Sequence, residues 1–347
     1  MLFQIWRGKL RLPMNESIPH PQPAFEHLAP EVILNAVEES FDLSLTGILT
    51  PYSSYINRVY GVETDDGERF VVKFYRPNRW SEEAILEEHR FVLDCVAEEL
   101  PVVAPEPASS GSTLQSAAVA TEGGERRFPF ALYRSKGGRL FDAEGEENWL
   151  RIGALIGRVH VAGRLGEAKH RLVCMPDEAT RGFIDEVRSA GVVHPDIGSE
   201  FFDVSEGILN HITPDFKETR LQRIHGDCHR GNILDRQTEG LMMIDFDDMV
   251  VGPPVQDIWL LLPDYADSSY VELELILEGY ERFGAFDRET IRLIEPLRFM
   301  RMVHFIAWSA RQRDDHRFRE AFPDWGEKSF WIKEIEDLRV QAQIIGL

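Results

Sequence analysis

The sequence predicts an α+β fold of two lobes, in which a mainly β first lobe with one long helix precedes a mainly helical second lobe. Its length of 347 residues is enough for about two domains of ordinary size. Strand patterns are concentrated before residue 135, whereas helix patterns dominate after it. Hydrophobic residues make up 43% of the chain, which is enough for a sizeable core without disulfides or a structural metal.

The first lobe is expected to span residues 23–135 and to hold an antiparallel sheet with one long helix. Residues 30–39 have a short helical pattern with proline near its start. Strand patterns at 55–63 and 69–75 flank a Thr-Asp-Asp-Gly turn, which predicts a hairpin. A longer helix is expected after Ser81, whose hydroxyl can cap it. Its apolar positions, spaced near 3.6 residues, are Ile85, Phe91, Val92, Cys95 and Val96.

The second lobe is expected to span residues 136–347, after a strand pattern at 128–135 and the break at Gly137-Gly138. Its main patterns are two helices at 147–161 and 289–310 and two short strands at 221–225 and 241–246. No internal repeat is visible. A β-rich lobe joined to a helical lobe in this way suggests a nucleotide held between the two.

Charge composition excludes two classes of partner. The formal net charge is −21, which disfavours a surface that binds DNA, RNA or an anionic membrane. It leaves open a cleft in which positive charge gathers locally, or acidic side chains that hold a divalent cation. No run of the sequence approaches the roughly 18 apolar residues of a membrane span. We therefore expect neither nucleic acid nor a membrane as a partner. As a separate expectation, the protein is a monomer.

Cysteine usage and the N-terminus bear on the compartment. Cys95, Cys174 and Cys228 lie far apart in the sequence, as is typical of free thiols in a reducing cytoplasm. Residues 1–22 contain several prolines and lack the apolar core of a signal peptide. We expect them to form a poorly ordered extension, with Met14 as an alternative start. These features predict a cytoplasmic protein.

Two segments contain the candidate catalytic residues, IHGDCHRGNIL at 224–234 and MMIDFDD at 242–248. The first must form a loop after a strand, because it contains Gly226 and Gly231. In the second, Asp245 follows the apolar run Met-Met-Ile, which is typical of the end of a strand. Both segments therefore present polar side chains where strands end.

Phosphoryl transfer from ATP requires three contributions from a protein. These are a carboxylate that orients and deprotonates the attacking hydroxyl, oxygen ligands for Mg²⁺, and a cation on the phosphates that are not transferred. Asp227 suits the first role, and Asn232 and Asp245 suit the second. Lys73 suits the third, because the strand pattern RFVVKFY carries it in the β-rich lobe. This order of residues is that of a eukaryotic-type kinase, and it predicts a bilobal protein-kinase-like fold with ATP and Mg²⁺ as cofactors.

A metal-dependent hydrolase is an alternative for the same loop. His225, Asp227 and His229 form an H-x-D-x-H pattern of the kind found in metallohydrolases, although zinc would leave the two proposed magnesium ligands without a role. We interpret Cys228, in the same loop, as a small neutral residue, because the neighbouring carboxylate would raise the pKa of its thiol.

These motifs resemble those of the aminoglycoside phosphotransferase and choline kinase superfamily, whose fold is protein-kinase-like. A narrower similarity is to the bacterial stress response kinase A group of Ser/Thr protein kinases. It spans about residues 25–340, and the segments that carry it are SYINRVY at 54–60, RFVVKFYRPNRW at 69–80, ILEEHRF at 85–91, HGDCHRGNIL at 225–234, GPPVQDIWLLL at 252–262 and IEPLRFMRMVHFIAW at 294–308.

The resemblance implies roles for particular residues. Asp227 would be the catalytic base. Asp245 would be the second catalytic residue and would bind magnesium together with Asn232. Lys73 would contact the phosphates of ATP, and Glu88 on the following helix would form the ion pair that positions this lysine.

The same resemblance implies where the nucleotide lies. Ser54, in the first β-turn, would contact it, although this turn lacks the G-x-G-x-x-G of ordinary protein kinases. The segment 133–136 would form a hinge whose backbone groups contact adenine. The cofactor-binding residues expected in this hinge are Tyr133, Arg134 and Ser135.

Several acidic residues keep alternatives open. Glu87 is the alternative to Glu88, because a shift of one residue in helical phase would exchange them. Asp257 resembles a residue that braces the catalytic loop, and we favour this structural role over a chemical one. Asp247 and Asp248 would either help to bind a second metal or be solvated acids.

Three functions are compatible with these residues. The first is an ATP- and Mg²⁺-dependent kinase of a stress response that phosphorylates Ser or Thr on a protein substrate. Autophosphorylation is a further option for the same enzyme. The second is a small-molecule kinase with an aminoglycoside, choline or a sugar as acceptor. A cleft lined by acids would favour a cationic acceptor, with which Trp149, Trp259 and Trp308 are compatible. The third is a nucleotide-binding module without catalysis.

Overall fold

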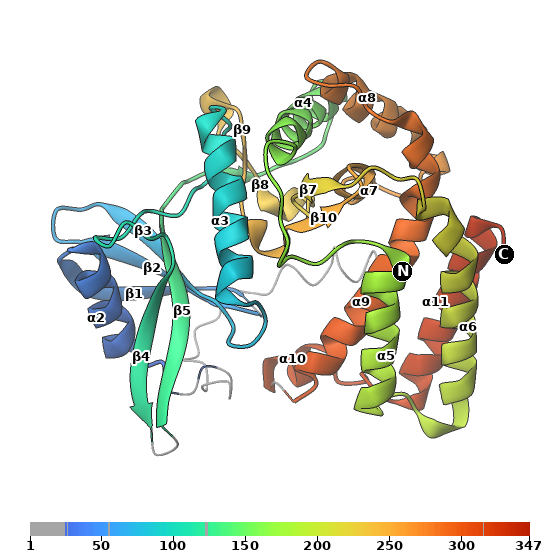
Figure 1. Cartoon of the computed structure of the whole chain (residues 1–347), viewed down its shortest axis with the longest axis horizontal. Coiled ribbons are helices and arrows are strands. Elements are labelled where there is room, and N and C mark those ends of the chain that lie inside the picture. The colour runs from blue at the N-terminus through green and yellow to red at the C-terminus, as the bar shows by residue number, and fades with distance from the viewer. Residues whose placement is uncertain (1–24, 26, 55, 122–123, 315) are drawn as a thin grey trace.

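A curled antiparallel sheet forms the first part of the fold, and a helical body with two small sheets forms the rest (Figure 1). This arrangement confirms the predicted α+β, kinase-like architecture. The computed structural model describes residues 25, 27–54, 56–121, 124–314 and 316–347. The N-terminal extension predicted at 1–22 lies outside these residues.

The large sheet has five strands in the order β1-β2-β3-β5-β4, and neighbouring strands are antiparallel. The predicted hairpin joins β2 to β3, and the backbone N–H of Gly67 donates to the carbonyl of Thr64 at 2.9 Å. Gly67 has a φ of +87°, a value that favours glycine. The strand bounds are β1 Leu45–Tyr52, β2 Arg58–Thr64, β3 Arg69–Phe74, β4 Gln115–Thr121 and β5 Gly124–Arg134.

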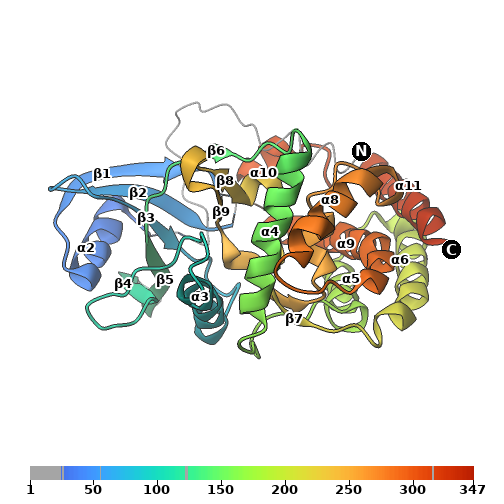
Figure 2. The same ribbon diagram turned by 90° about the horizontal axis from the view of Figure 1, so that it is seen from above.

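Two helices accompany this sheet. Helix α2 (Pro30–Phe41) packs against β1 and β4, and α3 (Glu82–Ala97) lies between the sheet and the helical body (Figures 1 and 2). The hydroxyl of Ser81 accepts from the N–H of Ala84 at 3.2 Å, so the predicted cap is confirmed. Val96, in the last turn of α3, was predicted on the buried face but is 44% exposed. We call β1–β5 with α2 and α3 the sheet lobe.

The helical lobe begins with α4 (Glu146–Gly163), which confirms the helix predicted at 147–161. The helix predicted at 289–310 starts later than expected, because residues 288–293 form a 3₁₀ turn before α9. Figure 1 shows α5, α6, α9 and α11 packed as a bundle. The remaining helices are α5 Arg181–Ala190, α6 Gly198–Ile212, α7 Val255–Trp259, α8 Tyr270–Glu281, α9 Ile294–Gln312, α10 His316–Ala321 and α11 Lys328–Ile345.

Two small sheets bring the predicted motifs together. The sequence predicted β7 and β9 as parts of longer strand patterns, but β6, β8 and β10 were missed, because these segments of two or three residues are not part of a longer pattern. One sheet has the order β6-β8-β9 and the other pairs β10 with β7. The strands are β6 Arg139–Leu140, β7 Gln222–Ile224, β8 Ile233–Asp235, β9 Leu241–Met243 and β10 Val250–Gly252.

Among the described residues, no helix is both long enough and apolar enough to cross a membrane. Helix α9 is a core helix, with Val303, Ile306 and Ala307 buried. Its apolar faces contact α5, α7 and α11, as expected for a helix that packs on several neighbours.

Glycines set the distance between α4 and α8. A Cβ atom on Gly153 would lie 2.0 Å from the carbonyl oxygen of Ile276, and one on Gly157 would lie 2.7 Å from that of Tyr280. From the other side, a Cβ on Gly279 would lie 2.1 Å from the carbonyl oxygen of Leu150. The two helices therefore pack backbone to backbone, which only glycine permits at these positions.

We predict that Gly153→Ala destabilises the protein by about 1–3 kcal/mol, because the added methyl must push the two helices apart. Gly207→Ala is the matched control, since Gly207 lies on the exposed face of α6 with no atom within 4 Å of its added Cβ. That change should stabilise the protein by up to about 1 kcal/mol. Urea unfolding gives the free energy of unfolding of both variants. Equal changes in the two variants would contradict the close packing of α4 and α8.

Candidate active site

Two loops in contact carry the motif residues. Asp227 and Asn232 lie between β7 and β8, and Asp245 lies between β9 and β10. Gly226 lets these loops touch, because a Cβ at this position would lie 2.1 Å from the carbonyl oxygen of Asp248. Its φ of +82° also favours glycine. The motif HGD therefore requires glycine for both the close approach and the backbone conformation.

Asp257 holds the first loop from beneath. Its Oδ2 accepts the backbone N–H of His225 and its Oδ1 accepts that of Gly226, each at 2.8 Å. The side chain of His160 lies 2.9 Å from Oδ2 through Nε2. Asp257 is 1% exposed, so these bonds satisfy a carboxylate that is otherwise removed from water. The structure thus confirms its predicted bracing role.

Lys73 reaches the second loop from β3. Its Nζ lies 3.0 Å from Oδ1 of Asp245 and 3.4 Å from Oδ1 of Asp247. Burial lowers the pKa of Lys73, but the charges of Asp245, Asp247 and Glu88 outweigh burial and raise the pKa well above its ordinary value. Lys73 therefore stays protonated, and the structure brings it together with Asp245.

The two candidate partners of Lys73 on α3 have different surroundings. Both carboxylate oxygens of Glu87 accept backbone N–H groups, from Lys169 and His170 at 2.8 Å each. Glu88 is 2% exposed, and its Oε2 has no hydrogen-bond partner. Burial raises the pKa of Glu88 to about 7, although Lys73 opposes this change. Glu88 is therefore the acid that faces the charge of Lys73.

The expected ion pair between Lys73 and Glu88 is not formed in the described structure. Lys73 instead forms its ion pairs with carboxylate oxygens of Asp245 and Asp247. Their carboxylates lie within 3.4 Å of the ammonium group, and they satisfy its charge. Glu88 contributes through the electrostatic field at longer range.

Arg79 joins the sheet lobe to Asp247 and Asp248, a contact that the sequence did not predict. Its guanidinium forms ion pairs with both carboxylates, and Asn57 donates from Nδ2 to Oδ2 of Asp247 at 3.1 Å. Burial raises the pKa of Asp247, but Arg79 and Lys73 outweigh burial and hold the pKa well below its ordinary value. Both acids are therefore paired with cations of the sheet lobe. This pairing favours neither of the two roles considered for them, ligands of a second metal or solvated acids.

Arg301 is a second contact that sequence reasoning missed. Its Nη2 lies 2.6 Å from Oδ1 of Asp227, although it comes from α9, 74 residues further along the chain. Burial raises the pKa of Asp227, but Arg301 and then His229 outweigh burial and hold the pKa well below its ordinary value. The only signal in the sequence was the segment IEPLRFMRMVHFIAW, which contains Arg301 without indicating its partner.

The proposed magnesium ligands have donor atoms that suit this ion. Asn232 donates its amide nitrogen to the backbone oxygen of Asp227 at 3.0 Å, which leaves its amide oxygen available. The side chain of Asp245 is 55% exposed, so its carboxylate is accessible. Mg²⁺ usually keeps several waters and binds proteins through one or two oxygens plus substrate phosphates. A carboxylate and an amide oxygen therefore fit such a site.

The zinc alternative finds no support in the described part of the chain. There, no group of three or more His, Cys, Asp or Glu residues is arranged to hold a metal. His225 lies 2.9 Å from the carbonyl oxygen of Ile244 through Nε2, and His229 accepts the N–H of Gly231 through Nδ1. Both rings thus hold the loop in shape. Cys228 is buried, and burial raises the pKa of its thiol well above its ordinary value, as a neutral filler requires.

The expected nucleotide-binding residues of the sheet lobe lie on loops and at a strand end. Ser54 accepts the N–H of Asn57 through its hydroxyl at 3.2 Å. The hydroxyl of Tyr133 lies 2.9 Å from that of Tyr75, and Arg134 pairs with Glu68 at the surface. The N–H of Ser135 donates to the carbonyl of Arg69 at 2.9 Å. The side chains of Tyr133 and Arg134 are therefore engaged within the sheet lobe.

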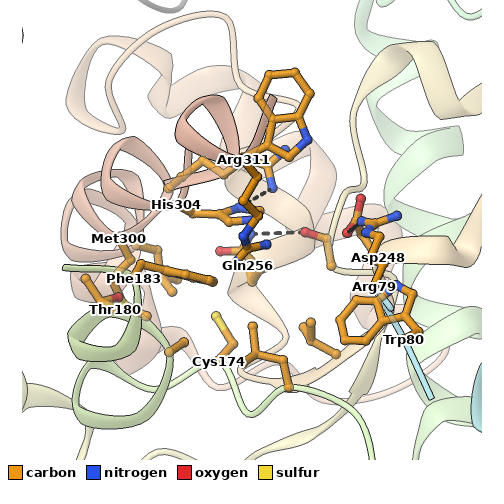
Figure 3. A pocket seen from close by; sticks show the side chains of 17 residues that line it. Arg79, Trp80, Cys174, Thr180, Phe183, Asp248, Gln256, Met300, His304 and Arg311 are labelled. Carbon is orange, nitrogen blue, oxygen red and sulfur yellow. Dashed lines mark hydrogen bonds and ion pairs between the residues drawn. The ribbon is translucent and has the colours of Figure 1, made fainter. Parts of the chain in front are cut away.

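A cavity of about 220 Å³ lies beside the catalytic loop. Figure 3 shows Phe183, His304 and Met300 along one side and Arg79 and Trp80 facing them from the other. Apolar and aromatic side chains form most of its wall. The charged residues that line it are Arg79, Asp248, Arg301 and Arg311.

The comparisons with known proteins agree with this geometry. Residues 48–294 match the model of the Phosphotransferase enzyme family. The chain belongs to this family and is a phosphotransferase enzyme. It is also a homologue of stress response kinase A: the protein of that name from Escherichia coli (strain K12) is 37% identical over 326 residues, which cover 92% of this chain and 94% of the relative. Serine/threonine protein kinase RdoA of Salmonella typhimurium is similar to the same extent.

Solved structures show the same fold at low identity. A complex of amicoumacin kinase hAmiN with AMP-PNP, Ca²⁺ and Ami has a TM-score of 0.69 at 18% identity, with 88% of this chain and 93% of that chain covered. A microcompartment-associated aminopropanol kinase has a TM-score of 0.61 at 15% identity, with 91% and 99% covered. These likenesses support the kinase-like fold.

We predict that Asp257→Ala destabilises the protein by about 2–4 kcal/mol and lowers its activity, because two buried N–H groups lose their acceptor. Asp203→Ala is the control, since Asp203 is an exposed residue of α6. Thermal unfolding and an ADP-release assay measure the two effects. A variant at 257 as stable as the control would show that the carboxylate does not brace the loop.

Proposed function

We propose that this phosphotransferase is an ATP- and Mg²⁺-dependent kinase that transfers the γ-phosphoryl group to Ser or Thr hydroxyls of proteins. The observation that carries the proposal is the convergence of Lys73 from the sheet lobe with Asp245, next to the loop that holds Asp227 and Asn232. These groups supply the cation, the metal ligands and the base that phosphoryl transfer requires. The family membership supports the reaction class.

Each residue has a distinct role in this proposal. Asp227 orients the acceptor hydroxyl and takes its proton, for which a carboxylate must be ionised, and Arg301 favours that state. Lys73 contacts the phosphates that are not transferred, and Glu88 supports its charge. A Mg²⁺ ion bound by Asn232 and Asp245 would neutralise charge on the phosphates. Asp245 therefore belongs to both the catalytic and the metal-binding set.

The nucleotide is proposed to lie between the lobes. We place the lobes at residues 23–135 and 136–347, which is supported by the end of β5 at Arg134 and by the pairing of β6 with β8. Ser54 would contact the nucleotide from the sheet lobe. Backbone groups in the hinge of Tyr133, Arg134 and Ser135 would contact adenine.

The cavity beside Asp227 supports a protein acceptor over a cationic small molecule. Three arginines and one carboxylate line it, and each is paired within the protein: Arg79 with Asp248, Arg301 with Asp227 and Arg311 with Glu186. Such a wall offers a cationic aminoglycoside or choline little favourable charge. Its volume of about 220 Å³ suits a single side chain better than a whole aminoglycoside. Of the three tryptophans considered above, Trp308 lines it, whereas Trp149 and Trp259 are buried in the core.

The names of the relatives support the finer assignment. Stress response kinase A and a Ser/Thr protein kinase are its homologues over nearly the whole chain. We therefore propose a role in a bacterial stress response, in the cytoplasm, as a monomer that acts on a protein and also on itself. The second candidate, a small-molecule kinase with the same site, is favoured by the small-molecule substrates in the names of the solved structures.

The test is incubation of the purified protein with radiolabelled ATP and Mg²⁺, followed by mass spectrometry. We expect label on Ser or Thr, and we expect Asp227→Ala to lower labelling by about 10²–10⁴-fold. Asp203→Ala should label like the unchanged protein. Labelling that survives Asp227→Ala would contradict the assignment.

The same assay with a library of small alcohols separates the candidates. Rapid ADP release with one alcohol and no labelled protein would favour the small-molecule kinase. Nucleotide binding without ADP release from any acceptor would favour a binding module.

A further inference from the structure

Arg301 occupies a position between the cavity and Asp227. It lies on α9, its side chain is 23% exposed, and it lines the cavity together with Gly226 of the catalytic loop. One of its nitrogens, Nη2, contacts Oδ1 of Asp227 at 2.6 Å. A short contact between a guanidinium and a carboxylate is among the stronger polar interactions in proteins. An acceptor that enters through the cavity would pass this ion pair.

The two carboxylate oxygens of Asp227 differ in how closely they are contacted. Oδ1 is held by Arg301, whereas Oδ2 lies at longer distances, 3.4 Å from Nε2 of His229 and 3.5 Å from Nδ2 of Asn232. Oδ2 is therefore the less tightly held oxygen. It is the atom that can exchange these weak contacts for the hydrogen of an acceptor hydroxyl.

On its other side, Arg301 makes a longer contact with its own helix. Its Nη1 lies 3.4 Å from Nδ1 of His304, one turn further along α9. Burial first, and then the neighbouring arginines, lower the pKa of His304 to about 3, so its ring is neutral and can accept a hydrogen bond. Phe183 stacks on this ring at 4.8 Å between centroids, on the cavity side that Figure 3 shows. The guanidinium therefore lies between the carboxylate of Asp227, which holds it at short range, and a packed imidazole at longer range.

We propose that Arg301 is a positioning residue for phosphoryl transfer, which fixes Oδ1 of Asp227 so that Oδ2 faces the acceptor hydroxyl. This inference rests on the proposed kinase function. In the step, the acceptor oxygen forms a bond to the γ-phosphorus and its proton passes to Oδ2. The bond from that phosphorus to the bridging oxygen breaks, and its electron pair leaves with ADP.

The geometry also accounts for an arginine at this position. Its planar fork can donate to Asp227 and to His304 at the same time, whereas the ammonium group of lysine is a compact point charge. A base that is misplaced by about 1 Å can lose about 10²-fold in rate. Removal of the fork should therefore affect the chemical step more than nucleotide binding.

The experiment compares steady-state kinetics of Arg301→Ala, Arg301→Gln and Arg301→Lys in the full chain. We expect Arg301→Ala to lower kcat about 10²-fold with the KM for ATP changed less than about threefold, and Arg301→Lys to recover part of the loss. Hydrolysis of ATP by water, which needs no bound acceptor, should fall in parallel. Arg292→Ala is the matched control, because it breaks a surface ion pair with Asp215.

A double-mutant cycle with Asp227→Ala gives the second readout. If Arg301 acts through Asp227, adding Arg301→Ala to Asp227→Ala should cause no further loss beyond about twofold. Multiplicative losses would overturn the inference, as would an Arg301→Ala variant with unchanged kcat. A variant that loses only acceptor affinity and keeps its ATP hydrolysis would also overturn it.

Two controls keep the outcomes distinct. Activity that survives Asp227→Ala alone would show that the proposed function is wrong, whereas loss in Asp227→Ala but not in Arg301→Ala refutes only the inference. Circular dichroism and ADP binding establish that each variant folds. If Arg301→Ala is unfolded, Arg301→Gln replaces it in the comparison, because glutamine keeps most of the side-chain volume. Full activity of Arg301→Gln would then refute the inference.

Discussion

The contact between Lys73 and Asp245 is the interaction on which the site depends. It joins residues 172 positions apart at 3.0 Å and connects the sheet lobe to the loop after β9. Arg79 and Asn57 reinforce it through Asp247, so three groups of the sheet lobe converge on one short acidic segment. Buried charges of this kind are stable only as a mutually paired set. The charged groups that connect the two lobes are therefore the same groups that would bind a nucleotide and its metal.

The net charge of −21 takes on a local meaning at this site. Acids of the two loops are matched individually by basic side chains, Asp227 by Arg301 and Asp247 by Arg79 and Lys73. Each pairing keeps a buried carboxylate ionised, since the cation outweighs the effect of burial on the pKa. Asp245 differs because it remains half exposed, which suits a residue proposed to exchange its lysine contact for a metal.

Local patterns predicted much of this structure. The capped helix after Ser81, the hairpin before Lys73 and the placement of Asp227 and Asn232 on one loop all follow from turn, cap and periodicity signals. Arg79 and Arg301 were not predicted, because an ion pair between distant segments leaves no periodic trace in the sequence. The short strands β6, β8 and β10 were missed for a related reason. Pairing in the tertiary structure, and not local propensity, makes them strands.

Calorimetric titration with a non-hydrolysable ATP analogue, with and without Mg²⁺, tests the central claim most directly. The account predicts binding that Mg²⁺ strengthens in the unchanged protein. It predicts affinity lower by about tenfold or more in Lys73→Met, and loss of the Mg²⁺ effect in Asp245→Asn. Asp203→Asn should bind like the unchanged protein. Equal affinities in all four proteins, with no effect of Mg²⁺, would contradict the claim that this ion pair marks the nucleotide site.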